Sequence, residues 1–374
     1  MSGIYIHIPF CKQACHYCDF HFRTNHKLKE QMVQAIVQEL KLQKNYLPEK
    51  TVRTIYFGGG TPSILQSREI GNILEAVYKD YEVAAAPEIT LEANPDDLSK
   101  TKLNELSTMG INRLSIGIQS FEERFLKLLN RAHGPREALQ AVENARSAGF
   151  DNLNLDLIYA IPHKDHSLWQ KDLDLMMKLR PEHLSAYSLT IEENTALGRW
   201  TKKGRFSPAD DHFSAEQFEQ LMETLSEHGY QQYEISNFCL PEKHSRHNTA
   251  YWKDKPYLGI GPGAHSYNGK SRQYNILNNP KYIRTLENGN IPFELETLDE
   301  EERLNEYLLT SLRTMWGINL NYLQSEFQDD LLKRKNSYLS KISTEGFIEI
   351  NNQAITLTKN GRLLADKIAC DLFL

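Results

Sequence analysis

Three cysteines near the N-terminus are the residues whose type and spacing point most directly to chemistry. Cys11, Cys15 and Cys18 follow the pattern C-x3-C-x2-C. Three thiols are an odd number for disulfide pairing and one ligand short of a closed tetrahedral zinc site. They suit an iron–sulfur cube in which three iron atoms carry thiolates and the fourth takes its ligand from elsewhere. Chemistry could then take place at that fourth, open iron.

A zinc site is the alternative interpretation of these cysteines. His7, His16 or His21 could supply the fourth ligand. The spacing lacks the paired C-x2-C arms that are typical of zinc ribbons and knuckles, and therefore favours the iron–sulfur interpretation. The two other cysteines, Cys239 and Cys370, are isolated in the sequence and are expected to be free thiols.

A glycine-rich stretch, Gly58-Gly59-Gly60-Thr61-Pro62, follows the second strand-like segment. Glycines at the end of a strand allow positive φ angles and a close approach of the backbone to a ligand. Their amides and carbonyls could hold a charged amino acid. A tight turn between a strand and a helix is the alternative, but the position one strand–helix unit after the cysteines favours ligand binding.

Short apolar strands alternate with helical patterns over most of residues 1–235, which predicts a parallel sheet with helices outside it. The expected strands are residues 4–8, 54–57, 88–92, 113–119, 153–158 and 183–189. Six such units make an incomplete (β/α)6 barrel, an α/β fold whose site lies at the C-terminal ends of the strands. The cysteine loop, the glycines and the polar residues Glu92, Gln119 and Asp156 fall at this edge.

Each of these polar residues also has an ordinary explanation. Glu92 and Gln119 could contact a ligand such as a ribose, or could be solvated side chains. Arg131 could hold a carboxylate in bidentate fashion. Asp156 lies within an apolar strand, where a charge without a partner is costly. Their convergence on one sheet edge is stronger evidence for a site than any single residue.

The remaining chain divides into two segments after the predicted barrel of residues 1–235. Residues 236–298 are interpreted as an irregular connecting segment, which contains the motif His247-Asn248-Thr249-Ala250-Tyr251-Trp252. Residues 299–374 show helices and a hairpin that turns at Asn351-Asn352, which predicts a mostly helical, winged-helix-like domain. Such domains often bind DNA, but the net charge of -6 and the lack of a basic helix favour a structural cap.

The composition indicates a soluble cytoplasmic protein. Of the 374 residues, 40% are hydrophobic and 25% are charged, as in ordinary globular proteins. No apolar run is long enough to span a membrane, and the N-terminus lacks the layout of a signal peptide. Clustered thiols fit a reducing compartment. The acidic balance also argues against nucleic acid as a partner, including the RNA substrate of a tRNA-modifying enzyme.

The cysteine loop, with Tyr17 before the last cysteine and after the first barrel strand, resembles that of the radical S-adenosylmethionine (SAM) superfamily. The resemblance implies that Cys11, Cys15 and Cys18 hold a 4Fe–4S cluster whose open iron is chelated by SAM. In that superfamily an electron from the cluster cleaves SAM to a deoxyadenosyl radical, so an electron donor is an implied partner. The glycine-rich stretch is similar to the element that contacts the methionine amino group in these proteins.

Further segments resemble the oxygen-independent coproporphyrinogen III dehydrogenase family, an anaerobic oxidase family of porphyrin biosynthesis. These segments are residues 5–11, 58–62, 91–95, 117–120, 130–131, 154–159 and 357–364. The resemblance implies that SAM is contacted by Tyr5, Tyr17, Gly59, Gly60, Thr61, Glu92, Gln119, Arg131 and Asp156. It also implies radical oxidative decarboxylation of coproporphyrinogen III as one possible activity.

Two departures argue against that activity. The dehydrogenases have a fourth cysteine two residues after the third, where this sequence has Phe20. They also carry a longer N-terminal segment that helps to build the substrate site, whereas ten residues precede Cys11 here.

The motif that begins at His247 resembles instead that of the HemW-type heme chaperones. The resemblance implies binding of heme and its transfer to an apo-haemoprotein, with contacts from His247, Asn248, Tyr251 and Trp252. A neutral imidazole suits an axial position on heme iron, and His265 is a second candidate. Tyr and Trp offer flat apolar faces for a macrocycle. A loop that is simply packed by aromatic residues is the alternative.

Overall fold

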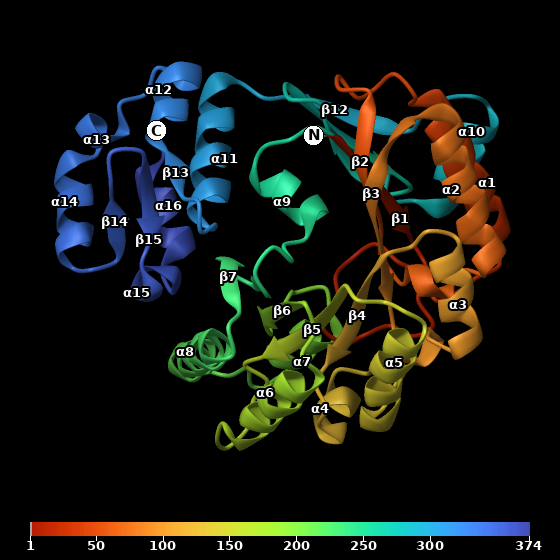
Figure 1. The fold of residues 1–374 in the computed structure, drawn as a ribbon, viewed down its shortest axis with the longest axis horizontal. Helices are drawn as coiled ribbons and strands as arrows, with labels where there is room; N and C mark the ends of the chain where they lie inside the picture. Colours follow the sequence, from red (N-terminus) through yellow and green to blue (C-terminus); the bar gives the residue numbers. More distant parts are fainter. Residues whose placement is uncertain (1) are drawn as a thin grey trace.

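Six parallel strands form the centre of the computed structural model, which describes residues 2–374 (Figure 1). These strands are β1 (Ser2–Ile8), β2 (Thr51–Gly59), β3 (Glu82–Ala93), β4 (Arg113–Gln119), β5 (Leu153–Tyr159) and β6 (His183–Ser188). They pair in chain order, each parallel to the next. The predicted α/β fold with an incomplete (β/α)6 barrel is confirmed.

Helices follow the strands and cover the outer face of the sheet. The long ones are α1 (Lys29–Leu42), α2 (Ser67–Asp80), α3 (Lys100–Thr108), α5 (Pro135–Ser147), α6 (Ser167–Leu179) and α8 (Asp211–Glu227). The short ones are η1 (Pro62–Ile64), η2 (Pro95–Asp97), α4 (Glu123–Leu128) and α7 (Ala196–Lys202). Figure 1 shows α1, α2 and α3 on one side of the sheet and a later helix, α9 (Arg246–Trp252), on the other.

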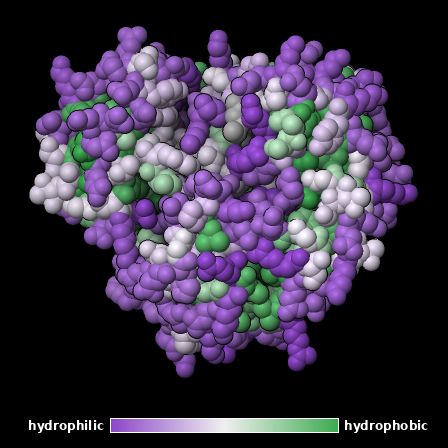
Figure 2. Space-filling model, viewed as in Figure 1, coloured by the Kyte–Doolittle hydropathy of each residue, from purple (hydrophilic) through white to green (hydrophobic). Residues whose placement is uncertain are grey.

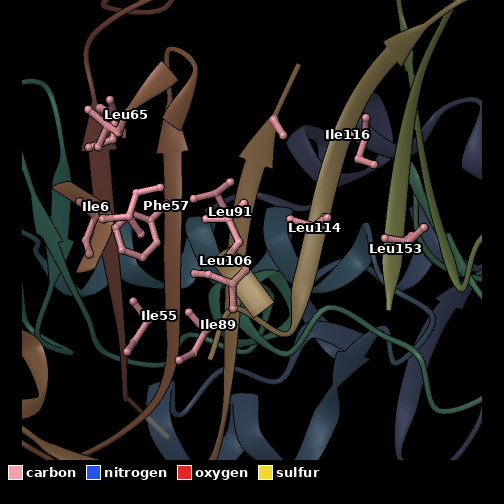
Figure 3. Close-up of a cluster of buried hydrophobic side chains, with 14 of the residues drawn as sticks. Ile6, Ile55, Phe57, Leu65, Ile89, Leu91, Leu106, Leu114, Ile116 and Leu153 are labelled. Atoms are coloured by element: carbon pink, nitrogen blue, oxygen red, sulfur yellow. The ribbon is translucent and has the colours of Figure 1, made fainter. Parts of the chain in front are cut away.

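The strands alternate between an apolar outer face and a polar inner face. A continuous row of paired, buried side chains under the helices consists of Ile6, Phe57, Leu91, Leu114 and Leu153 (Figure 3). Successive side chains on a strand point to opposite faces. The neighbours of this row, among them Tyr5, Tyr56 and Glu92, therefore line the concave inner face. The sequence of each strand thus supplies both a core and a polar site.

Residues 236–298 are not irregular, which corrects the interpretation made from the sequence. This segment forms β8 (Asn237–Cys239), β9 (Tyr257–Ile260), β10 (His265–Tyr267), β11 (Ser271–Asn275), β12 (Phe293–Thr297), α9 and α10 (Asn279–Glu287). Strand β9 pairs in parallel with β1, and β10 to β12 extend the sheet beyond it. At the other edge, β8 and β7 (Gln231–Glu234) follow β6. Strands of three to five residues carry too few positions to show a clear period.

The C-terminal part folds around a hydrophobic core of its own. Its elements are α11 (Glu300–Leu312), β13 (Ile318–Asn319), α12 (Leu320–Phe327), α13 (Leu331–Arg334), α14 (Asn336–Thr344), β14 (Ile348–Ile350), β15 (Ala354–Leu357), α15 (Lys359–Arg362) and α16 (Ala365–Leu372). The hairpin β14–β15 is confirmed, and β13 pairs with β15 to complete a small sheet. Because most of these elements are helices, the mostly helical character of this domain is confirmed. The residue boundaries of the three predicted segments stay a prediction.

The barrel and the C-terminal domain are joined by polar contacts. Arg313 Nη2 lies 3.0 Å from Glu234 Oε1, and the Met315 N–H donates to the Tyr233 carbonyl oxygen at 3.0 Å. Figure 2 shows mainly hydrophilic side chains on the face of the molecule seen in Figure 1, with small hydrophobic patches between them. Within residues 2–374, no helix combines the length and the apolar character that crossing a bilayer requires.

Candidate functional site

The cysteine loop follows β1 and is held by contacts from outside the loop. The Cys11 N–H donates to the Arg23 carbonyl oxygen at 3.1 Å. Asn130 Nδ2 donates to the Ala14 carbonyl oxygen at 2.7 Å. Because backbone groups of the loop are paired with groups from later segments, the fold itself positions the three thiols.

Histidines near the loop are engaged elsewhere. Ring nitrogens of His7 and His16 lie 2.9 and 2.8 Å from the carbonyl oxygens of His21 and Leu128, and His21 Nε2 lies 2.7 Å from Asn279 Oδ1. Among residues 2–374, no three His, Cys, Asp or Glu side chains are grouped to share one metal ion. A cube distributes its thiolates over separate iron atoms. The histidines considered as a fourth zinc ligand therefore all have other hydrogen-bond partners.

Arg131 ties this loop to the end of the sheet. Its Nη1 lies 3.3 Å from Cys15 Sγ and 3.3 Å from the Tyr17 hydroxyl oxygen. Its Nη2 donates to Asn94 Oδ1 at 2.7 Å and to the Gly117 carbonyl oxygen at 2.9 Å. The buried Nε has no hydrogen-bond partner among residues 2–374. A guanidinium in this position stabilises a thiolate and leaves one donor free for an anionic ligand.

Two of the free thiols, Cys11 and Cys18, are poor acids in this environment. Burial raises the pKa of Cys11 to about 11, although a hydrogen bond from Thr61 lowers it. Burial also raises the pKa of Cys18 to about 12. Thr61 Oγ1 lies 3.4 Å from Cys11 Sγ. Because thiolates are the form that binds metal, loading this loop with iron would release protons.

The glycine-rich stretch packs against the loop so closely that side chains would not fit. Gly59 has a φ of +103°, and a Cβ there would lie 2.6 Å from the His7 ring. A Cβ on Gly60 would lie 2.6 Å from the Phe10 carbonyl oxygen. The Gly60 N–H donates to the Ile8 carbonyl oxygen at 2.9 Å. Glycine is therefore required here by the close approach of the protein's own His7 ring and backbone carbonyls.

Glu92 lies near the C-terminal end of β3 on the inner face and is partly exposed. The Tyr56 hydroxyl donates to Glu92 Oε1 at 2.8 Å. Burial raises the pKa of Glu92 to about 7, with Tyr56 and Arg113 acting in the opposite direction. The carboxyl group can therefore accept hydrogen bonds from a ligand, and its charge is sensitive to what binds beside it.

The other predicted contacts lie on the same inner face or close to it. Asn154 Nδ2 donates to Asp156 Oδ1 at 2.7 Å, and burial raises the pKa of Asp156. Gln119 ends β4 with a φ of +66°. The Tyr5 ring stacks on Tyr56 with a centroid distance of 6.1 Å. The structure thus brings the predicted cofactor residues to neighbouring strand ends, and their individual contacts with SAM stay a prediction.

Two side chains in this site were not predicted. Tyr56 supports Glu92, and Asn94 accepts from Arg131. Both positions carry a signal in the sequence, because Tyr56 lies two residues before Gly58 and Asn94 two residues after Glu92. Residues two apart on a strand share a face. The period of β2 could therefore have identified Tyr56, whereas Asn94 lies one residue beyond the end of β3.

Helix α9 places His247 in the interior, where it is 2% exposed. His247 Nδ1 lies 2.8 Å from Thr54 Oγ1, and Nε2 lies 2.8 Å from the Tyr251 hydroxyl oxygen. Its backbone N–H donates to Glu88 Oε1 at 2.9 Å. Burial lowers the pKa of His247 to about 3, so the ring is neutral. Ligation of heme iron would require one ring nitrogen to leave its present partner, and this role stays a prediction.

The second half of the motif lines a cleft between the barrel and the C-terminal domain. This interdomain cleft has a volume of about 210 Å³ and is lined by Tyr251, Trp252, Asp254, Lys255, Tyr257, Tyr267, Arg272, Glu306, Tyr307 and Thr310. Arg272 Nη2 donates to Glu306 Oε2 at 2.7 Å. The buried Trp252 Nε1 has no hydrogen-bond partner among residues 2–374.

Asn248 lies in the first turn of α9, where its N–H donates to Ser245 Oγ at 3.2 Å. His265, the second candidate ligand, is exposed on β10.

Two family models match this chain. The model of the radical SAM superfamily matches residues 5–176, which include the cysteine loop and the predicted SAM contacts. The model of the HemN C-terminal domain matches residues 298–364. The first match covers the strands from β1 to β5, and the second covers most of the C-terminal domain; β6 and the segment with α9 lie between the two matches.

Curated relatives resemble the chain over most of its length. It is 32% identical to the heme chaperone HemW of Bacillus subtilis, over 98% of each chain. It is 40% identical to the heme chaperone HemW of Escherichia coli, over 70% of this chain and 69% of the relative. The solved structure of coproporphyrinogen III oxidase (HemN) from Escherichia coli, a radical SAM enzyme, is 22% identical, with a TM-score of 0.87 over 100% of this chain and 90% of the other.

Proposed function

Because the chain belongs to the radical SAM superfamily and to its HemN-like family close to HemW, we propose that it is a cytoplasmic heme chaperone. It binds heme and passes it to an apo-haemoprotein. The observation that carries this proposal is the similarity to a curated heme chaperone over 98% of both chains. The aromatic interdomain cleft beside the motif of α9 supports it.

The cofactors of this proposal are a 4Fe–4S cluster and SAM. Cys11, Cys15 and Cys18 would hold the cluster, which with bound SAM and an electron donor supplies one-electron chemistry. The Nε–H of Arg131, which has no partner among the described residues, suits the carboxylate of an amino acid group beside these thiols. Glu92 and Asp156 offer acceptors for hydroxyl groups on the same face. The residues present therefore fit both cofactors.

Heme would enter the interdomain cleft. Tyr251, Trp252 and Tyr257 supply flat apolar faces, and Lys255 supplies a positive charge for a propionate, whereas Arg272 is paired with Glu306. A cleft of about 210 Å³ is smaller than the ~300–1,000 Å³ typical of pockets that enclose a ligand. The macrocycle would therefore insert by one edge and stay accessible, which suits a protein that must release its cargo.

Heme titration of the reconstituted protein tests this proposal. The wild-type protein should bind heme stoichiometrically, with a Soret band, and should transfer it to an apo-haemoprotein in a mixing experiment. His247→Ala should weaken binding or change the Soret band, whereas His212→Ala, at a side chain 82% exposed and on α8, should not. Absence of heme binding by the wild-type protein would contradict the proposal, and unchanged binding by His247→Ala would remove the role of His247.

Radical oxidative decarboxylation of coproporphyrinogen III is the second candidate function. The fold it shares with HemN, at a TM-score of 0.87, favours this candidate. Phe20 argues against it, because it occupies the place of the dehydrogenase family's fourth cysteine with a side chain that is 68% exposed. Anaerobic incubation of the reconstituted protein with coproporphyrinogen III, SAM and a reductant decides between the two. Formation of protoporphyrinogen IX would show that the chain is more than a chaperone.

A further inference from the structure

His247 is in contact with the cofactor side of the barrel as well as with its own helix. Its ring stacks on Tyr56 with a centroid distance of 5.0 Å and an interplanar angle of 24°. Tyr56 in turn donates to Glu92 Oε1 at 2.8 Å. A direct column of three side chains therefore runs from the motif on α9 to the carboxylate proposed to contact SAM.

The barrel has a socket that is shaped for this imidazole. A Cβ on Gly3 would lie 3.1 Å from His247 Nδ1 and 2.5 Å from Thr54 Oγ1, so glycine leaves the space that the ring occupies. Thr54 lies 2.8 Å from the ring, and Glu88 accepts the His247 N–H. A ring that lies against Gly3 and Thr54, on a backbone anchored by Glu88, has little freedom, so it fixes the plane of Tyr56 that stacks on it.

The same imidazole is connected to the interdomain cleft. Its Nε2 lies 2.8 Å from the Tyr251 hydroxyl oxygen, and the Tyr251 ring packs edge-on against Tyr257 at a centroid distance of 4.4 Å. Both tyrosines line the cleft. His247 therefore lies between the two proposed ligand sites and touches a side chain of each.

We propose that His247 is a positioning residue for the SAM site, which acts by holding Tyr56 in place to support Glu92. The motif that the family resemblance assigns to heme thereby also supports binding of SAM. Through His247, direct side-chain contacts connect the proposed SAM site with the proposed heme site. This inference rests on the proposed SAM site. It does not depend on whether His247 ligates iron, because stacking requires a flat ring and ligation requires an imidazole nitrogen.

Equilibrium binding of SAM to the cluster-loaded protein tests the inference with three variants. Tyr56→Phe keeps the stacked ring and removes the hydroxyl donor to Glu92, so SAM should bind about tenfold more weakly. His247→Ala should produce a similar loss. His247→Phe keeps a ring on Tyr56 and should restore most of the affinity for SAM. Tyr78→Phe, at an exposed position on α2, is the matched control and should bind like the wild type.

The outcomes separate this inference from the proposed function. SAM affinities within about twofold of the wild type in Tyr56→Phe and His247→Ala would overturn it. Equal losses in His247→Ala and His247→Phe would also overturn it, because the stacked ring would then be irrelevant. A wild-type protein that holds the cluster but binds no SAM would contradict the cofactor site itself. Heme titration of the same proteins reports separately on iron ligation, for which phenylalanine cannot replace histidine.

Discussion

The guanidinium of Arg131 lies 3.3 Å from the sulfur of Cys15. A positive charge beside this sulfur would compensate the negative charge of the thiolates that hold a cluster. Because Arg131 also bonds to Asn94 and Gly117, it carries this charge in a fixed orientation. Arg131 therefore holds the cysteine loop in a fixed position relative to the C-terminal ends of β3 and β4.

Arg131→Gln should lower both the stability and the cofactor affinity of the protein. Asn94 and Gly117 would each lose a charged donor, which should cost about 1–3 kcal/mol in the free energy of unfolding. Retention of iron after anaerobic reconstitution should fall as well. Urea unfolding and iron analysis measure the two effects. Arg124→Gln, which loses an exposed ion pair with Glu122 and an exposed contact with His163 Nε2, should change neither.

Cys15→Ser should abolish the cluster, because a serine hydroxyl stays protonated and is a poor ligand for iron. Iron content and visible absorbance after anaerobic reconstitution measure the loss. Cys370→Ser is the matched control, since Cys370 is an exposed thiol on α16. Undiminished iron in Cys15→Ser would show that the loop does not hold the cluster.

Gly60→Ala should destabilise the protein. The new Cβ would lie 2.6 Å from the Phe10 carbonyl oxygen and 2.8 Å from that of Ile8, so the loop or the strand must shift. We expect a loss of about 1–3 kcal/mol in urea unfolding, together with weaker SAM binding. Gly71→Ala in α2 is the control, because its nearest neighbour would be Met109 Sδ at 3.4 Å. Alanine stabilises a helix interior by up to about 1 kcal/mol relative to glycine, so this variant should not lose stability.

The parts of the site that the sequence predicts are those with a local pattern. The cysteines, Glu92 and the glycines all stand at strand ends, and a parallel barrel brings strand ends together. The partners of His247 could not be predicted in this way. Thr54 belongs to a strand almost two hundred positions earlier in the chain, and only the packing of α9 across the strands brings the two together.

The buried carboxyl group of Glu39 should make stability depend on pH. Burial raises its pKa from 4.5 to about 7, although Tyr282, Gly261 and Asn275 donate hydrogen bonds to it. The folded protein then retains a proton that the unfolded chain releases above pH 4.5. The contribution of Glu39 to the free energy of unfolding should therefore be highest below pH 4.5 and should fall by roughly 3 kcal/mol as the pH rises to about 7.

Urea unfolding at several pH values in this range gives the free energy of unfolding as a function of pH. The contribution of Glu39 is the difference between the slopes of this curve for the wild type and for Glu39→Gln. Glu39→Gln carries no titrating group at this position, so its stability should fall less steeply than that of the wild type. Glu75→Gln, at an exposed position on α2, should keep the wild-type slope. Parallel curves for the wild type and Glu39→Gln would show that this carboxyl group is not protonated in the folded protein.

Tyr251→Phe should strengthen heme binding if His247 Nε2 is the iron ligand. The Tyr251 hydroxyl now occupies that nitrogen at 2.8 Å, and breaking this hydrogen bond opposes ligation by about 1 kcal/mol. Phenylalanine removes the competing hydroxyl and keeps an aromatic ring in the cleft, so heme affinity should rise about fivefold. Tyr257→Phe, which leaves the hydrogen bond to His247 intact, is the control. A lower affinity in Tyr251→Phe would mean that the tyrosine hydroxyl itself serves the heme, and that His247 only holds it.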